Sequence, residues 1–301
     1  MSCRCSPAAA QGKPMLYAQA LINGVLLGAT YGLMALGLSL IFGVLRIINF
    51  AHGNFMVLGM YASYWLFTLL GVDPYVSLLP AAALLFFVGF IVQRYVLNPI
   101  IEAPEEMSFL TTLGLGLIIQ NLVLMAFGPD LHTIDTPYKL ASLAVGDLNI
   151  DVSKLLAFIA SLLITGAFFS FLQWSETGRA IRAASDNREA ARLMGIDTKK
   201  IYCVAFAIGA ATTGAAGACF STFIPTSQDV GMLFTLTSFV IVIAGGVGTY
   251  HGTLIGGFVI GIAEELGAVM LSGSMKQVVS FCLLMVILLF RPQGLFGRES
   301  D

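Results

Sequence analysis

The sequence predicts an all-α integral membrane protein, a polytopic helical bundle of about 8–9 transmembrane segments with a broken helix near residues 46–54. Of the 301 residues, 57% are hydrophobic and only 11% are charged, whereas about a quarter of the residues in soluble domains are charged. Apolar runs recur at about the 20-residue length that a bilayer core requires. Ten of the 32 charged residues lie between Trp174 and Lys200, and the cost of burying charge in hydrocarbon places that stretch in water.

Nine apolar segments follow one another along the chain, and glycines and prolines at positions such as 71–74 and 128–129 separate them as turn signals. The expected spans are 16–42, 55–70, 75–97, 109–127, 152–172, 201–223, 232–247, 253–271 and 277–290. Small residues at every fourth position allow membrane helices to approach closely. Two such ladders occur, one at Gly24, Gly28 and Gly32 and one at Gly248, Gly252 and Gly256, followed by Gly257 and Gly261.

The first apolar run, residues 15–45, is long for one crossing, because its 31 residues would extend about 46 Å as an α-helix. The next span, 55–70, is short. A broken or re-entrant helix near residues 46–54 would account for both features, and Gly53 would permit a bend there.

The positively charged residues divide unequally between alternate connections, which orients the chain by the positive-inside rule. With residues 174–200 inside, ten Lys and Arg residues lie inside and five outside. We therefore expect the N-terminus outside and the C-terminus in the cytoplasm. Residues 1–14 are expected to form a flexible tail, and residues 15–301 a single transmembrane domain that carries the charged 174–200 loop.

Two groups of polar residues interrupt the apolar segments, and both are candidates for a substrate pathway. Asn49, His52 and Asn54 lie in the expected break, and irregular backbone in a membrane is tolerated only against protein or a watery cavity. Glu264 and Glu265 lie within the expected span 253–271, where an ionisable residue is a functional candidate by default. A plain interfacial turn at 46–54 and a hydrogen-bonding role between helices for Glu264 stay open as alternatives.

Within the charged segment, residues 185–195 predict a short amphipathic helix. Ser185 or Asp186 would cap it, and Glu189 would lie in its first turn. Gly195 would end it. Its small apolar face would consist of Ala190, Leu193 and Met194. The alternative is a basic loop that only sets the topology.

Several kinds of chemistry lack their sequence signals. There is no G-x-x-x-x-G-K-[ST] phosphate loop. The three histidines, His52, His132 and His251, are scattered, and no spacing of His and Cys suits a metal. We expect no catalytic residues, no metal and no cofactor in this chain, and no nucleic-acid partner.

The segment from Glu189 to Gly195 reads E-A-A-x-x-x-G and resembles the EAA loop of ABC importer permeases, although the usual Leu-Pro tail of that signature is absent. From about residue 21 to residue 297, the chain resembles the branched-chain amino acid ABC transporter permeases of the LivH type. The motifs that carry this resemblance are N-G-V-L-L-G-A-T-Y-G at 23–32, I-N-F-A-H-G at 48–53, G-R-A-I-R at 178–182, G-G-V-G at 245–248, G-I-A-E at 261–264 and R-P-Q-G-L-F-G at 291–297.

The resemblance implies a transmembrane permease subunit of an ATP-driven importer for branched-chain or related amino acids, in the bacterial plasma (inner) membrane. The implied partners, besides the lipid bilayer, are a second homologous permease subunit, two ABC ATPase subunits that bind ATP and Mg²⁺, and an extracytoplasmic substrate-binding protein. The 178–197 loop would couple to the ATPases through Gly178, Arg179, Arg182, Asp186, Asn187, Glu189, Ala190 and Gly195.

Two positions depart from the family pattern. Glu265 adds a second carboxylate where a small residue is usual, and the loop 98–106 is acidic where relatives are more basic. An ion-coupled secondary transporter or channel is the alternative function. In that case Glu264, Glu265 and His52 would relay ions or protons, and residues 174–200 would be a passive loop.

Overall fold

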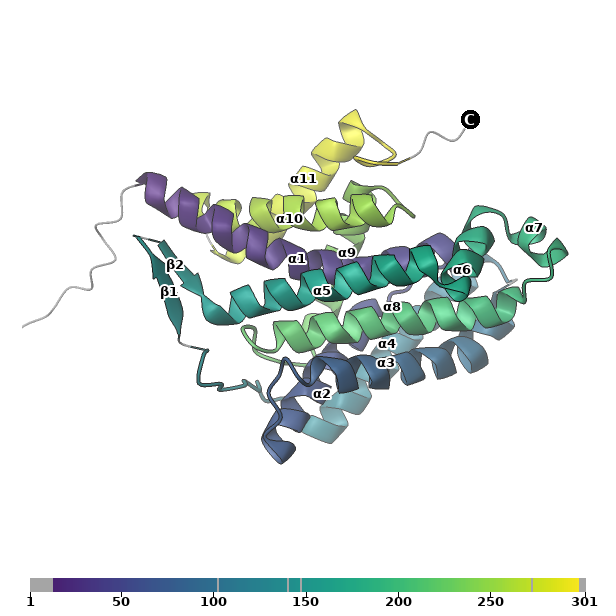
Figure 1. Cartoon of the computed structure of the whole chain (residues 1–301), viewed down its shortest axis with the longest axis horizontal. Coiled ribbons are helices and arrows are strands. Elements are labelled where there is room, and N and C mark those ends of the chain that lie inside the picture. The colour runs from purple at the N-terminus through teal and green to yellow at the C-terminus, as the bar shows by residue number, and fades with distance from the viewer. Residues whose placement is uncertain (1–12, 102, 140, 147, 272, 298–301) are drawn as a thin grey trace, which may run out of the picture.

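The computed structural model describes residues 13–101, 103–139, 141–146, 148–271 and 273–297. This part of the chain folds into an α-helical bundle with one two-stranded hairpin (Figure 1). The α-helices are α1 (Lys13–Leu45), α2 (His52–Leu70), α3 (Leu78–Val92), α4 (Glu105–Phe127), α5 (Val152–Trp174), α6 (Glu176–Asp186), α7 (Arg188–Leu193), α8 (Thr198–Phe220), α9 (Val230–Gly245), α10 (Tyr250–Met270) and α11 (Lys276–Phe290). A π-helical turn (Gln93–Leu97) and a 3₁₀ turn (Asn98–Ile100) extend α3, and a second 3₁₀ turn (Gly273–Met275) precedes α11.

The expected polytopic helical bundle is confirmed. In the described part of the chain, six helical segments are long and apolar enough to cross a membrane, namely Met15–Leu45, Leu78–Ile100, Glu106–Phe127, Val152–Trp174, Thr198–Phe220 and Tyr250–Met270. The other three expected spans fall on the shorter apolar helices α9 and α11 and on the 19-residue helix α2.

The expected start and end of the first span were wrong. Helix α1 is continuous over 33 residues, so the break follows this helix and does not shorten it. It begins at Lys13, and the expected tail at 1–14 otherwise falls on residues 1–12, outside the described residues. The helix stays long because its neighbours cover it, and most of its side chains from Leu26 onward are buried.

Helices α1 and α10 pack against each other through the first glycine ladder on α1 and through Gly257 and Gly261 on α10, whereas Gly252 and Gly256 of the second ladder lie against α9. A Cβ atom added at Gly28 would lie 2.7 Å from the Cα of Phe258, and one at Gly24 would lie 2.6 Å from the Cα of Ile262. A step of four residues forward on α1 therefore matches a step of four residues backward on α10, as in an antiparallel pair. These glycines bring the two backbones into contact, which stabilises membrane helices through van der Waals packing.

A β-hairpin closes one end of the bundle. Strands β1 (Ser142–Val145) and β2 (Leu148–Asp151) are antiparallel and lie near the start of α1 (Figure 1). The Gln19 side chain donates to the carbonyl oxygen of Asn149 at 2.6 Å and accepts from its N–H at 3.0 Å. Residues 129–151 therefore contain ordered structure that is attached to α1. Helices α6 and α7 lie at the opposite end of the bundle (Figure 1).

Candidate functional site

The expected break is present as a non-helical segment between Leu45 and His52. Among the described residues, Arg46 is the one non-glycine residue with a positive φ, at 57°, a conformation that costs a non-glycine residue roughly 1–2 kcal/mol. Arg46 and Ile48 are exposed, whereas Ile47 and Asn49 are buried. The break therefore turns Ile47 and Asn49 toward the core and Arg46 and Ile48 outward.

Two threonines from neighbouring helices satisfy the backbone of the break. The Thr112 hydroxyl on α4 lies 3.0 Å from the carbonyl oxygen of Ile48 and accepts the N–H of Phe50 at 3.2 Å. The Thr235 hydroxyl on α9 accepts the N–H of Gly53 at 2.9 Å. A backbone group left unpaired in an apolar environment costs several kcal/mol, so these threonines stabilise the interruption of the helix.

The structure places Asn49, His52 and Asn54 together at this junction, with their side chains buried. The Asn49 Oδ1 atom accepts the N–H of Ala51 at 3.1 Å, and the His52 Nε2 atom lies 3.1 Å from the carbonyl oxygen of Met34. Within the described residues, the Nδ2 atom of Asn49 and the Nδ1 atom of His52 have no hydrogen-bond partner. Buried polar atoms are rarely left unpaired, so these two atoms can take part in further hydrogen bonds.

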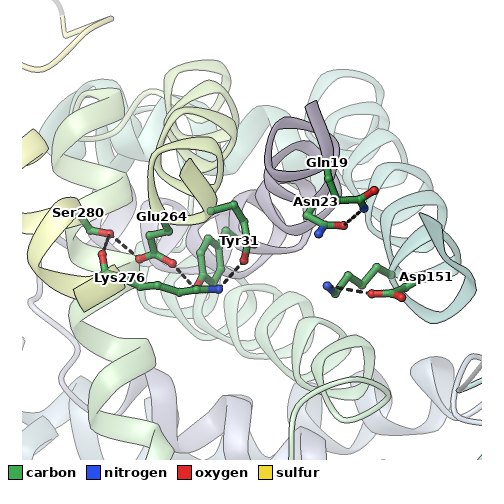
Figure 2. Close-up of polar contacts among 9 residues, drawn as sticks. Gln19, Asn23, Tyr31, Asp151, Glu264, Lys276 and Ser280 are labelled. Atoms are coloured by element: carbon green, nitrogen blue, oxygen red, sulfur yellow. Dashed lines mark hydrogen bonds and ion pairs between the residues drawn. The ribbon is translucent and has the colours of Figure 1, made fainter. Parts of the chain in front are cut away.

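Glu264 lies in a second polar cluster, between α10, α1 and α11 (Figure 2), and Glu265 follows it on α10. Glu264 is 2% exposed, and the Tyr31 hydroxyl donates to its Oε2 atom at 2.8 Å. The Ser280 hydroxyl donates to its Oε1 atom. The Lys276 ammonium pairs with Glu265 at 2.6 Å. Both carboxylates therefore have partners that join helices, which agrees with the structural alternative for Glu264.

The charged segment forms two helices, α6 and α7: α7 is the expected short helix, and α6 was not expected. Helix α6 already begins at Glu176, where the Ser175 hydroxyl accepts the N–H of Gly178 at 2.8 Å. Gly178 lies against the end of α5, because an added Cβ would come within 2.5 Å of the carbonyl oxygens of Phe171 and Leu172. The close approach fixes α6 on the bundle, and Arg179 and Arg182 on this helix are exposed.

The cap of α7 is Asn187 and not Ser185 or Asp186. The Asn187 side chain accepts the N–H groups of Glu189 and Ala190, each at 3.0 Å. An asparagine in extended conformation at this position is a favourable N-cap. As expected, the helix ends before Gly195, which has φ 83°. The apolar side chains of Leu193 and Met194 are 88% and 83% exposed.

Helix α6 is joined to the end of α1, directly before the break. The Ser185 hydroxyl donates to the carbonyl oxygen of Gly43 at 2.8 Å. A hollow of about 490 Å³ lies between the two elements, and Arg46, Asp186 and Glu189 are among the residues that line it. The charged helices and the break therefore form one continuous region.

Sequence reasoning did not find several residues that hold these sites. Thr112 and Thr235 lie within ordinary apolar spans, and the hydroxyl partners of Glu264 are far from it in sequence. The pairing of Lys276 with Glu265 had a weak signal, since Lys276 is a cation at the start of the span that follows Glu265.

A bundle of long apolar helices, with a broken helix and an exposed charged helix pair at one end, defines a polytopic membrane protein. The family model that matches residues 20–288 is described as the branched-chain amino acid transport system / permease component. The chain belongs to this family.

The relatives cover nearly the whole chain. It is 30% identical over 304 residues to the high-affinity branched-chain amino acid transport system permease protein LivH of Escherichia coli K12, covering 95% of this chain and 97% of the relative. It is 30% identical to BraD of Pseudomonas aeruginosa, covering 94% and 97%. It is 26% identical to LivM of Escherichia coli K12, covering 94% and 71%. A chain of PsaBC from Streptococcus pneumoniae is 13% identical with a TM-score of 0.47, covering 92% of both chains.

Proposed function

We propose that this chain is a transmembrane permease subunit of an ATP-driven importer for branched-chain or related amino acids. Membership of the permease family supports the transport role. The observation that carries the coupling role is the hydrogen bond from Ser185 to Gly43, because it joins the charged helices to the last turn of α1 before the break. A movement of α6 would thus reach the residues that line the break.

Helix α7 would contact the ATPase partners. It is short, capped and charged, and its end exposes Leu193 and Met194. Large apolar side chains that stand exposed beside charged ones are typical of interaction sites. The residues expected to couple to the ATPases lie on α6, on α7 or close to the ends of these helices. They include Arg179, Arg182 and Glu189.

The orientation follows from the same assignment. The α6–α7 end would face the cytoplasm, and the hairpin end would face the exterior, with the N-terminus outside and the C-terminus inside. ATP and Mg²⁺ would be bound by the two ATPase subunits. The substrate-binding protein would dock at the hairpin end, where Gln19 attaches β2 to α1. A second homologous permease would complete the pathway.

The pathway would pass the break. The unpaired buried atoms of Asn49 and His52 suit a zwitterionic cargo, which needs weak polar contacts in order to pass and leave. Asn54 lies beside them on α2, and Glu264 and Glu265 complete the proposed set of pathway residues.

The decisive experiment uses an ATPase partner that binds but does not hydrolyse ATP. We expect ATP-dependent leucine uptake into proteoliposomes to be lost. Uptake that survives would support the ion-coupled alternative and contradict the proposal.

Two substitutions test the parts. Arg182→Glu combined with Glu189→Arg should abolish co-purification with the ATPases while the chain still inserts into the membrane, and Lys139→Glu, in the loop that precedes the hairpin, serves as the control. Unchanged co-purification would remove the coupling role from α6 and α7. Normal uptake by Glu264→Gln would remove Glu264 from the pathway and leave it the helix-joining role that its partners Tyr31 and Ser280 already indicate.

A further inference from the structure

An apolar pocket of about 440 Å³ lies directly beside the break. Its walls come from α1, the break, α4 and α9, and include Phe42, Ile48, Phe50, Phe109, Phe239 and Val247. The rings of Phe50 and Phe109 meet edge to face at 4.8 Å, and those of Phe50 and Phe239 lie 5.3 Å apart. The aromatic contacts form a wall of fixed shape, suited to an apolar group smaller than the pocket.

Arg46 lies at the rim of this pocket. A second hollow of about 330 Å³ is lined by Arg46 and shares Phe42, Ile48 and Val247 with the apolar pocket, so the two spaces adjoin. The Arg46 side chain is exposed and forms neither a hydrogen bond nor an ion pair with the described residues. Its backbone has the unfavourable φ of 57°, and such strain in a fold is concentrated at functional positions.

The exposed side chains of the break lie beside one hollow. Arg46 and Ile48 are both exposed and line the same hollow, and Ile48 also lines the apolar pocket. A guanidinium group binds carboxylates through paired, charge-assisted hydrogen bonds. A ligand that places an aliphatic group against Ile48 and Phe50 would thus present a carboxylate on its α-carbon to Arg46.

We propose that the apolar pocket and Arg46 form a cargo subsite, in which the pocket takes the aliphatic side chain of an amino acid and Arg46 takes its α-carboxylate. The inference rests on the proposed import function and specifies which residues select the cargo within this subunit. Asp186 and Glu189 line the hollow on the other side of Arg46 and stay clear of the apolar pocket. Because Arg46 lines both hollows, these carboxylates are the acidic groups available to the cargo's ammonium group.

The test uses the purified transporter, with this chain, its permease partner and the ATPases, but without the substrate-binding protein. Radiolabelled L-leucine is the probe, and L-leucinamide, which lacks the carboxylate, is the competitor. For the wild type we expect leucinamide to compete at least tenfold less well than leucine. Arg46→Gln should weaken leucine binding about tenfold, the loss expected for a hydrogen bond to a charged group. The same variant should lose the preference for leucine over leucinamide, whereas Arg46→Lys should keep part of this preference.

The pocket half of the subsite is tested by Ile48→Trp, which fills the pocket from an exposed position. Ile255→Trp on α10 is the matched control, because both isoleucines are 39% exposed and Ile255 does not line the pocket. Leucine binding should fall at least tenfold in Ile48→Trp and stay unchanged in Ile255→Trp.

The outcomes separate this subsite from the proposed function. Suppose that the wild type takes up leucine in an ATP-dependent way. Normal leucine binding in Ile48→Trp, or an intact preference for leucine over leucinamide in Arg46→Gln, then overturns the subsite alone. The subsite is also overturned if the wild type transports but binds no leucine, or if Ile48→Trp loses its permease partner, since the pocket is then a subunit contact. Absence of ATP-dependent uptake of any aliphatic amino acid by the wild type would overturn the import function itself.

Discussion

The N-cap of α7 offers a sharp test of the charged helix pair, because α7 has only six residues. Helices this short are marginal in water without additional interactions. Asn187 accepts two backbone N–H groups, from Glu189 and Ala190. Replacing such a cap by alanine costs about 1 kcal/mol, which corresponds to a roughly fivefold shift toward the unwound helix.

Hydrogen exchange of the purified chain in nanodiscs measures this shift directly. In Asn187→Ala, the amides of residues 191–193 should exchange about fivefold faster, and ATPase co-purification should weaken in parallel. Asn187→Asp and Asn187→Ser keep an oxygen acceptor and should retain most of the protection. The reasoning is refuted if the aspartate variant exchanges as fast as the alanine variant, or if the alanine variant exchanges like the wild type.

Three further predictions concern other parts of the fold. Gly28→Leu should lower the free energy of unfolding by about 1–3 kcal/mol in a thermal or denaturant assay, because its Cβ would meet the backbone of α10 at 2.7 Å. Gly166→Leu is the control and should have little effect, because Gly166 has open space around it. Thr112→Val should destabilise the break by about 1 kcal/mol, since it unpairs the partly buried N–H group of Phe50; equal stability would show that another group satisfies it. The hydrogen bond from the Lys200 amide lowers the pKa of Asp197 below its ordinary value, so this cap of α8 should act fully at neutral pH and be lost only as the pH falls through that lowered pKa. The protection factors of the amides at the start of α8, which correct for the intrinsic pH dependence of exchange, should follow this course and become independent of pH in Asp197→Asn.

The course of the chain was largely predictable from hydropathy, because each expected span falls on one helix. The same signal misplaced the ends of α1. Hydropathy reports transfer into an apolar environment and does not distinguish lipid from protein, so it cannot tell that α1 is covered by α8 and α10 over most of its length. The glycine ladders were visible in sequence, but spacing alone does not specify their partners: the first ladder meets Gly257 and Gly261, whereas Gly252 and Gly256 lie against α9.

The sites were predictable to different degrees. The break between Leu45 and His52 could be expected from its polar residues, whereas Thr112 and Thr235, which stabilise it, are typical of any membrane helix. The cap of α7 was misplaced by one or two residues because Ser185, Asp186 and Asn187 are all good cap residues. Tertiary contact decides among them, since the Ser185 hydroxyl is engaged by Gly43.

Helix α1 gives the molecule a mechanical connection from end to end. Its 33 residues reach about 50 Å, with Gln19 bonded to the hairpin near its start and Gly43 bonded to α6 near its finish. A rigid helix of this length transmits a movement along its axis from one end of the bundle to the other, and no series of side-chain rotamer changes is needed. In the proposed importer, docking at the hairpin end would shift α6 at the opposite end by rigid translation, and a flexible insertion in the middle of α1 would uncouple the two ends while leaving each of them intact.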